Sequence, residues 1–244
     1  MHGTEVQVVF LVVESAPSTR EALCYVLLSF GIKGIPAASR RDAWELLAAH
    51  GGIEGAIIDI DNKEVEGVAL VRELKENEKT RNLTIIVHTV QSRKEFVLSM
   101  IDIGVAGYLL KPFDPETAHA KLSPILAKVA THDKQRKHIR IQPDESELAR
   151  VHFRLPSHPS LVSGRIIDIS LGGIAVELLN PADPALLAPE SQIQKLEFVL
   201  AGRELAPSAR IVMLKSNVLA LRFSEMSSSE KTALERYIFK RISS

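Results

Sequence analysis

Two short runs of this sequence, R-K-H-I-R at residues 136–140 and D-I-S-L-G-G at residues 168–173, decide the interpretation of its second half. Arg136 and Arg140 carry planar guanidinium groups, whose paired donors fit the O6 and N7 edge of guanine or a phosphate group. The second run supplies a carboxylate, a hydroxyl and a glycine at D-x-S-x-x-G spacing: Asp168, Ser170 and Gly173. Together these groups predict a site for a small dianion that contains guanine.

The residues around these runs have the character of a small all-β domain. Six runs with strand character are separated by turn residues: 148–155, 163–169, 173–179, 193–200, 205–214 and 218–223. Many short strands with regular turns are typical of a small antiparallel barrel. A helix is expected after Ser227, where Glu230 completes a cap and the apolar residues that follow share one face.

The two runs, in this order and followed by an alternating apolar strand, resemble the PilZ family of cyclic di-GMP receptors over roughly the last 110 residues of the chain. The resemblance implies that Arg136 and Arg140 contact guanine. It also implies guanine or ribose-phosphate contacts for Asp168 and Ser170. Gly173 would admit a close approach of the ligand, although the same glycine also suits a tight turn between strands.

The first half of the sequence alternates buried strands with helices. The strands are expected at residues 8–13, 32–35, 53–60, 83–89 and 107–110, and the helices at 17–30, 39–49, 65–75, 93–101 and 114–130. Such alternation predicts an α/β doubly wound domain, in which helices cover both faces of a parallel sheet. Ligands and chemistry gather at the carboxyl ends of the strands in such a sheet.

Polar residues stand at these strand ends. They are Glu14 and Ser15 after the first strand, Asp59 at the end of the third, Thr89 at the end of the fourth, and Lys111 after the fifth. The runs F-L-V-V-E-S, I-I-D-I-D-N-K-E-V-E-G, I-I-V-H-T and G-Y-L-L-K-P-F together resemble a CheY-type response-regulator receiver domain, from residue 5 to about residue 130.

The receiver resemblance implies a role for each of these residues. Asp59 would accept a phosphoryl group, Lys111 would contact it, and Thr89 would move together with Tyr108. A cis peptide bond is implied between Lys111 and Pro112. A carboxylate nucleophile, a divalent cation and a lysine would suit phosphoryl transfer.

The sequence departs from the receiver pattern after the first strand, where the family has two acidic residues and this chain has Glu14 and Ser15. A serine hydroxyl lacks the charge that Mg²⁺ ligands supply, so Mg²⁺ binding is doubtful and no metal site is assigned. Two interpretations of Asp59 follow. It is phosphorylated despite weak metal affinity, or it forms a standing ion pair with Lys111 in a pseudo-receiver, which we favour because the transfer depends on metal charge.

The length of 244 residues fits two domains. We expect a receiver-like domain at residues 1–130, a basic linker at residues 131–140 and a PilZ-like β-barrel domain with a C-terminal helix at residues 141–244. Thirty basic residues balance thirty acidic ones, and Cys24 is the single cysteine. With no long apolar segment, the composition predicts a cytoplasmic protein without disulfides and without membrane insertion.

The expected function is a non-enzymatic cyclic di-GMP sensor in bacterial signal transduction. Ligand binding would order the linker that carries Arg136 and Arg140 and so reorient the receiver-like domain. The alternative is a phosphorylation-controlled response regulator whose barrel only contacts other proteins. Nucleic acid is not expected, because no recognition helix or aromatic platform accompanies the basic linker. The downstream protein is unknown, and a homodimer stays open.

Overall fold

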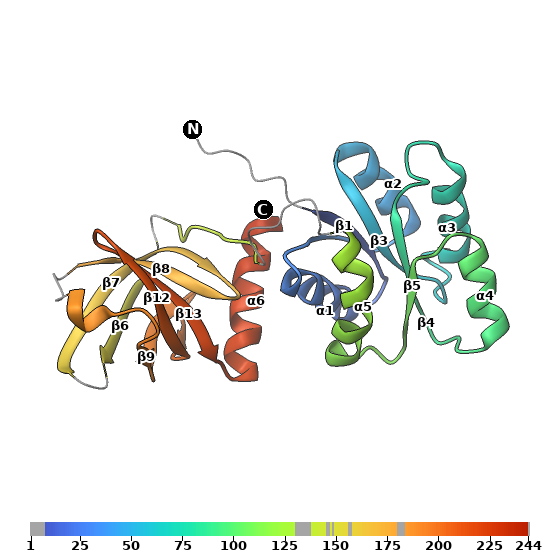
Figure 1. Cartoon of the computed structure of the whole chain (residues 1–244). Helices are drawn as coiled ribbons and strands as arrows, with labels where there is room; N and C mark the ends of the chain where they lie inside the picture. Colours follow the sequence, from blue (N-terminus) through green and yellow to red (C-terminus); the bar gives the residue numbers. More distant parts are fainter. Residues whose placement is uncertain are drawn as a thin grey trace. The chain divides into compact units, whose positions relative to one another are not determined.

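A computed structural model describes residues 8–129, 138–144, 147, 149–155, 158–179 and 184–243. These residues form two compact units, which divide between residues 129 and 138 (Figure 1). Most of the predicted linker lies outside the described residues, and so does Arg136. Each unit has its own sheet, with eight strands in the second unit and five in the first.

The first unit is built on a parallel sheet. Its strands are β1 (Val9–Val13), β2 (Lys33–Ala37), β3 (Ile53–Asp59), β4 (Thr84–Thr89) and β5 (Gly107–Leu110), in the order β2-β1-β3-β4-β5. The strand expected at residues 32–35 continues to Ala37. It tolerates the exposed Pro36 because β2 is an edge strand, where a missing N–H group breaks no ladder on its outer side.

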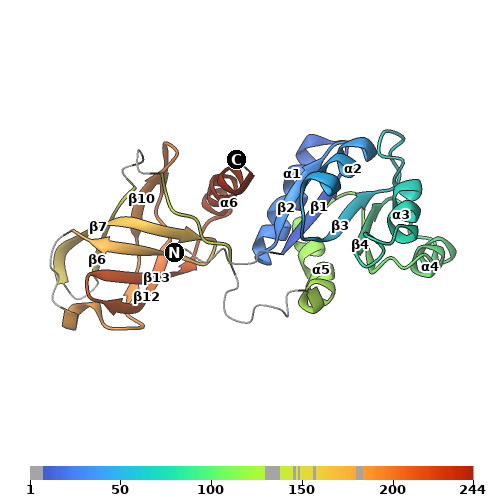
Figure 2. The same ribbon diagram turned by 90° about the horizontal axis from the view of Figure 1, so that it is seen from above.

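Five helices cover the two faces of this sheet (Figures 1 and 2). They are α1 (Pro17–Ser29), α2 (Arg40–Ala49), α3 (Gly67–Glu76), α4 (Lys94–Asp102) and α5 (Pro115–Val129). Helices α1 and α5 contact each other on one face, and residues of α2, α3 and α4 join the core cluster of the other face. Because helices bury both faces, the strands are almost continuously apolar. The predicted α/β doubly wound fold is confirmed.

The second unit is an antiparallel sheet in the order β11-β10-β6-β7-β8-β13-β12-β9. Its strands are β6 (Arg150–Leu155), β7 (His158–Ser170), β8 (Gly173–Leu178), β9 (Gln192–Ile193), β10 (Leu196–Leu200), β11 (Arg203–Leu205), β12 (Ser208–Lys215) and β13 (Val218–Glu225), and the 3-10 helix η2 (Pro184–Leu187) precedes β9. The sheet curls into a partly open barrel, because the edge strand β9 contacts β6.

Two of the expected barrel strands are each divided. The run at 193–200 is interrupted at Gln194 and Lys195, and the run at 205–214 is interrupted at Ala206 and Pro207. Proline has no N–H group for a ladder, so a strand that contains it in its interior loses a hydrogen bond. The antiparallel β-domain itself is confirmed.

A C-terminal helix, α6 (Ser228–Ser243), completes the second unit. Ser227 and Glu230 form the expected cap: the Ser227 N–H donates to Glu230 Oε2 at 2.9 Å, and the Glu230 N–H donates to Ser227 Oγ at 3.3 Å. Leu234 and Ile238 of α6 are fully buried. Among the described residues, no helix has the length and apolar character that a membrane crossing needs.

Candidate functional sites

The carboxyl ends of β3 and β5 bring Asp59 and Lys111 together. Lys111 Nζ lies 2.5 Å from Asp59 Oδ1, and the Asp59 carboxylate also accepts the Asp61 N–H at 3.0 Å. Only 2% of Asp59 is exposed. Burial favours a lower pKa for Lys111, but the hydrogen bond to Asp59 and nearby carboxylates outweigh it and raise the pKa above the usual value. The peptide bond between Lys111 and Pro112 is cis, as the resemblance implied.

The Asp61 carboxylate contacts three donors of this pocket. Its Oδ1 accepts the Thr89 hydroxyl at 2.8 Å, its Oδ2 accepts the Val90 N–H at 2.7 Å, and Lys111 Nζ lies 3.4 Å from Oδ2. A hydroxyl, a backbone N–H and an ammonium group are the donors that an anion at this sheet edge would need. Here the chain's own carboxylate contacts all three. Asp61 was not among the site residues predicted from the sequence, although it stands two residues after Asp59.

Glu14 contacts a partner that the sequence analysis missed. Its Oε2 lies 3.0 Å from His88 Nδ1, and its Oε1 accepts the Ala16 N–H at 3.1 Å. Glu14 and His88 are 3% and 1% exposed. Burial favours a higher pKa for Glu14, but the His88 hydrogen bond, the Ala16 N–H and the charge of Lys111 lower the pKa below its usual value. The only signal in the sequence was a polar residue inside the apolar run I-I-V-H-T.

The residues at the Mg²⁺ position of the receiver pattern are therefore engaged elsewhere. Glu14 is bonded to His88, and the Ser15 hydroxyl accepts Asn62 Nδ2 at 2.6 Å. Within the described part of the chain, no three His, Cys, Asp or Glu side chains are grouped closely enough to hold a metal ion. These contacts fit Mg²⁺ poorly, because such an ion needs several free oxygen ligands in octahedral geometry.

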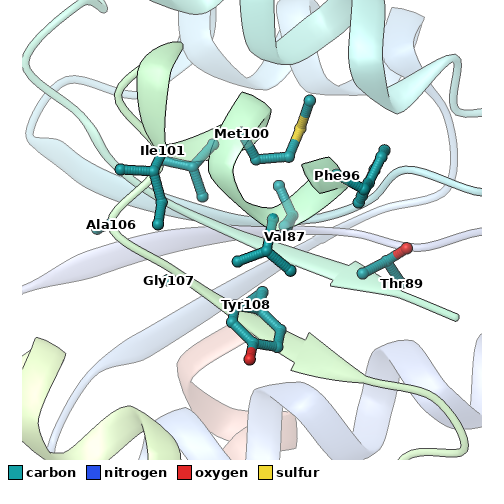
Figure 3. A pocket seen from close by; sticks show the side chains of 10 residues that line it. Val87, Thr89, Phe96, Met100, Ile101, Ala106, Gly107 and Tyr108 are labelled. Carbon is teal, nitrogen blue, oxygen red and sulfur yellow. The ribbon is translucent and has the colours of Figure 1, made fainter. Parts of the chain in front are cut away.

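Thr89 also lines a cavity of about 200 Å³ beside helix α4 (Figure 3). Phe96, Met100 and Ile101 form the helix side of this cavity, and Tyr108 lines it from β5. Tyr108 is 37% exposed, and Lys121 Nζ lies 5.1 Å from the centroid of its ring. Thr89 thus borders both the carboxylate pocket and this mainly apolar cavity.

In the second unit, the described end of R-K-H-I-R lies along β7. Arg140 Nη1 is 3.4 Å from Asp168 Oδ2, and the two side chains are 49% and 28% exposed. Ile141 and Ile169 exchange two backbone hydrogen bonds of 2.9 Å. The structure therefore brings Arg140 to the carboxylate that the sequence analysis assigned to the same site.

The D-x-S-x-x-G residues form the turn between β7 and β8. Ser170 Oγ donates to the Gly173 carbonyl at 3.2 Å and accepts the Gly172 N–H at 3.3 Å. A Cβ atom at Gly173 would lie 2.0 Å from the Leu221 carbonyl oxygen of β13, and one at Gly172 would lie 2.6 Å from His138 Cδ2. Neighbouring protein atoms therefore leave no room for a side chain at either glycine, whether or not a ligand also needs space at Gly173.

Models of two protein families match the chain. The response regulator receiver domain matches residues 10–123, and the PilZ domain matches residues 134–240. Two similar curated proteins cover the first part. The Campylobacter jejuni chemotaxis protein CheY homolog is 28% identical over 48% of this chain and 90% of its own length, and the Helicobacter pylori chemotaxis protein CheY1 is 28% identical over 48% of this chain and 94% of its own length.

A solved structure, that of a sensor protein from Polaromonas sp. JS666, is 24% identical, covers 50% of this chain and 98% of its own, and has a TM-score of 0.44. The fold and the family matches define a signalling protein. The chain carries a response regulator receiver domain followed by a PilZ domain. The PilZ domain implies binding of cyclic di-GMP.

Proposed function

We propose that this protein is a non-enzymatic cyclic di-GMP sensor whose ligand site comprises Arg136, Arg140, Asp168, Ser170 and Gly173. Receiver and PilZ domains are non-enzymatic domain types. The single observation that carries the proposal is the placement of Arg140 beside Asp168, in a chain whose residues 134–240 match the PilZ model. Arg136 lies outside the described residues, and its role rests on the R-x-x-x-R spacing alone.

The geometry supports a binding mode in which Arg140 and Asp168 give up their contact with each other and bind the ligand instead. The Arg140–Asp168 separation of 3.4 Å is long for a charged hydrogen bond, and about half of Arg140 is exposed. Such a surface pair contributes little stability. Arg140 is therefore able to turn its guanidinium fork to the O6 and N7 edge of guanine, while Asp168 accepts hydrogen bonds from the donors of a base.

Ligand binding is also proposed to order the rest of the linker of residues 131–140 against the barrel, where Arg140 already lies beside Asp168, and so to change the position of the receiver domain, residues 1–130, relative to residues 141–244. The ligand shifts this equilibrium only by the difference between its affinities for the two arrangements. A downstream protein would recognise the new arrangement of the two domains, and the sensor would act as a monomer or a homodimer. Neither nucleic-acid binding nor membrane insertion is part of the proposal. A cytoplasmic location suits the single cysteine, because a chain with Cys24 alone forms no internal disulfide.

For the receiver domain we infer a pseudo-receiver. The Asp59–Lys111 pair and the contacts of Asp61 fill the strand-end pocket with the chain's own groups. The engaged Glu14 and Ser15 leave Mg²⁺ binding doubtful.

Calorimetric titration of the full-length protein with cyclic di-GMP tests the ligand. We expect micromolar or tighter binding by the unaltered protein and its loss in Arg136→Ala and Arg140→Ala. Arg203→Ala is a matched control, because Arg203 is exposed on β11 and makes no ion pair within the described residues. No binding by the unaltered protein, or unchanged binding by both arginine variants, would reject the proposal.

A further inference from the structure

One row of cross-strand pairs crosses four neighbouring strands of the barrel. Ser170 of β7 is paired with Gly173 of β8, Gly173 with Arg222 of β13, and Arg222 with Arg210 of β12. Directly paired residues of antiparallel strands project from the same side of a sheet. The neighbours Leu221 and Ile211 are buried and therefore face the core, whereas Arg222 and Arg210 are exposed. The two arginines thus continue the row that begins at the proposed ligand site.

Arg222 has no counter-ion among the residues that the structure describes. Within the described residues it makes no salt bridge or side-chain hydrogen bond, and its cross-strand partner Arg210 carries the same charge. Arg210 has one acidic neighbour, Glu190, but the pair is separated by 3.7 Å and both side chains are more than half exposed. Like charges directly opposite each other destabilise a sheet. An anion placed between these guanidinium groups would remove that repulsion.

Arg222 and Ser170 flank Gly173 on neighbouring strands, and Ser170 is 5% exposed. Gly173 puts no side chain between the two residues, and β13 lies so close that a Cβ atom at Gly173 would meet the Arg222 Cα at 3.0 Å. Strands are spaced by about 4.8 Å, so Arg222 stands roughly 10 Å from Ser170, which an extended arginine largely spans. Arg222 also lines a groove of about 290 Å³ together with Arg210, Glu190, Val212, Phe223 and Ser224.

We propose that Arg222, supported by Arg210, is a further ligand-binding residue that holds a phosphodiester group of the bound dinucleotide. This inference rests on the proposed function and adds a second basic side to its site. Arg140 and Asp168 would bind a guanine on the β7 side, and Arg222 would bind the phosphate over β8 and β13. A phosphate is assigned because two adjacent cations favour an anion over a neutral base edge, and guanidinium binds phosphate through paired donors.

Titration of the full-length protein with cyclic di-GMP tests this assignment, with Arg222→Ala, Arg222→Lys and the control Arg203→Ala. We expect Arg222→Ala to weaken binding roughly tenfold or more, as for the loss of a charged hydrogen bond. Arg222→Lys should recover part of the affinity, because lysine keeps the charge. The salt dependence of binding should be shallower for Arg222→Ala than for the unaltered protein.

The outcomes separate the two proposals. If the unaltered protein binds and Arg222→Ala binds equally well, the proposed function survives and the role of Arg222 is rejected. If Arg222→Lys is as weak as Arg222→Ala, the phosphate assignment is overturned. If the unaltered protein does not bind, the proposed function fails and this assignment fails with it. Unfolding curves of each variant confirm that the barrel is folded, since Arg222 is exposed.

Discussion

Each domain contains an ion pair of one cation and one carboxylate. The two pairs differ in burial and in whether the donors around them are already bonded within the chain. In the receiver, Lys111 lies 2.5 Å from Asp59, which is 2% exposed, and Asp61 binds the donors that remain. In the PilZ domain, Arg140 lies 3.4 Å from Asp168, with about half of Arg140 exposed. The receiver pocket is satisfied from within the chain, whereas the barrel face retains cations that a ligand is able to engage.

Solvation explains this difference. A buried charge without a partner costs several kcal/mol, so the receiver pocket is stable only when its groups pair with one another. An exposed charge is stabilised by water, and a loose surface pair is worth at most about 1 kcal/mol. The barrel face therefore exchanges its internal contacts for a ligand at small cost.

The largest effect is expected from opening the receiver pocket. We predict that, with Mg²⁺, beryllofluoride binds to a Ser15→Asp/Asp61→Ala variant and not to Ser15→Asp alone. The new aspartate supplies a metal ligand, but Thr89, the Val90 N–H and Lys111 become available only when Asp61 is removed. Fluorine NMR of bound beryllofluoride is the measurement.

Adding Asp59→Asn to the double variant is the control and should abolish the bound signal. A bound signal in the unaltered protein or in Ser15→Asp would show that Asp61 does not block the pocket. A silent double variant would also contradict the role given to Asp61.

The second prediction compares the stability that the two pairs contribute. Lys111→Met should lower the free energy of unfolding of the receiver domain by about 3 kcal/mol, because it leaves the Asp59 charge buried without a cation. Arg140→Met should change the stability of the barrel by less than about 1 kcal/mol. Urea unfolding of each variant measures both values, and Asp59→Asn in the Lys111→Met background should recover part of the loss. Equal losses in the two domains would refute the contrast.

The smallest effect is the pH dependence of the stability that the buried Glu14 contributes. Its pKa in the folded protein is lowered, so its ionised form stabilises the fold above the unfolded-state pKa, and this contribution is lost as the pH falls through the folded-state pKa. The stability advantage of the unaltered protein over Glu14→Gln should therefore shrink between neutral pH and about pH 3. Unfolding curves over this range provide the test, and an advantage that grows on acidification would contradict the sign.

The parallel sheet was predictable because its strands are buried on both faces and leave long apolar runs. The strand at Gly107–Leu110 has the predicted bounds, and β4 begins one residue later than expected. The barrel was harder, since its strands are half exposed and short turns interrupt them. Strand β7 begins at His158, before the expected residue 163, because a proline near the start of a strand does not exclude pairing.

The residues of the candidate sites were also only partly predictable from the sequence. Family spacing led to Asp59, Thr89 and Lys111, which lie at the strand ends where they were expected. It also led to Asp168 of β7 and to Arg140, which was expected in a flexible linker but lies beside Asp168. Asp61, His88 and Arg222 were missed because their importance depends on neighbours across the sheet, which no local spacing encodes. The hydrogen bond between Glu14 and His88 was also not predictable from the spacing, and both side chains are buried.

The reciprocal hydrogen bonds between Ile141 and Ile169 have a consequence for affinity. They hold the residue next to Arg140 on the strand that carries Asp168, so this half of the site is pre-organised and loses little conformational entropy on binding. They also fix the register of the segment. One residue inserted between Arg140 and Ile141 would turn the arginine to the opposite side of the strand, and binding would fall even though every side chain of the site was still present.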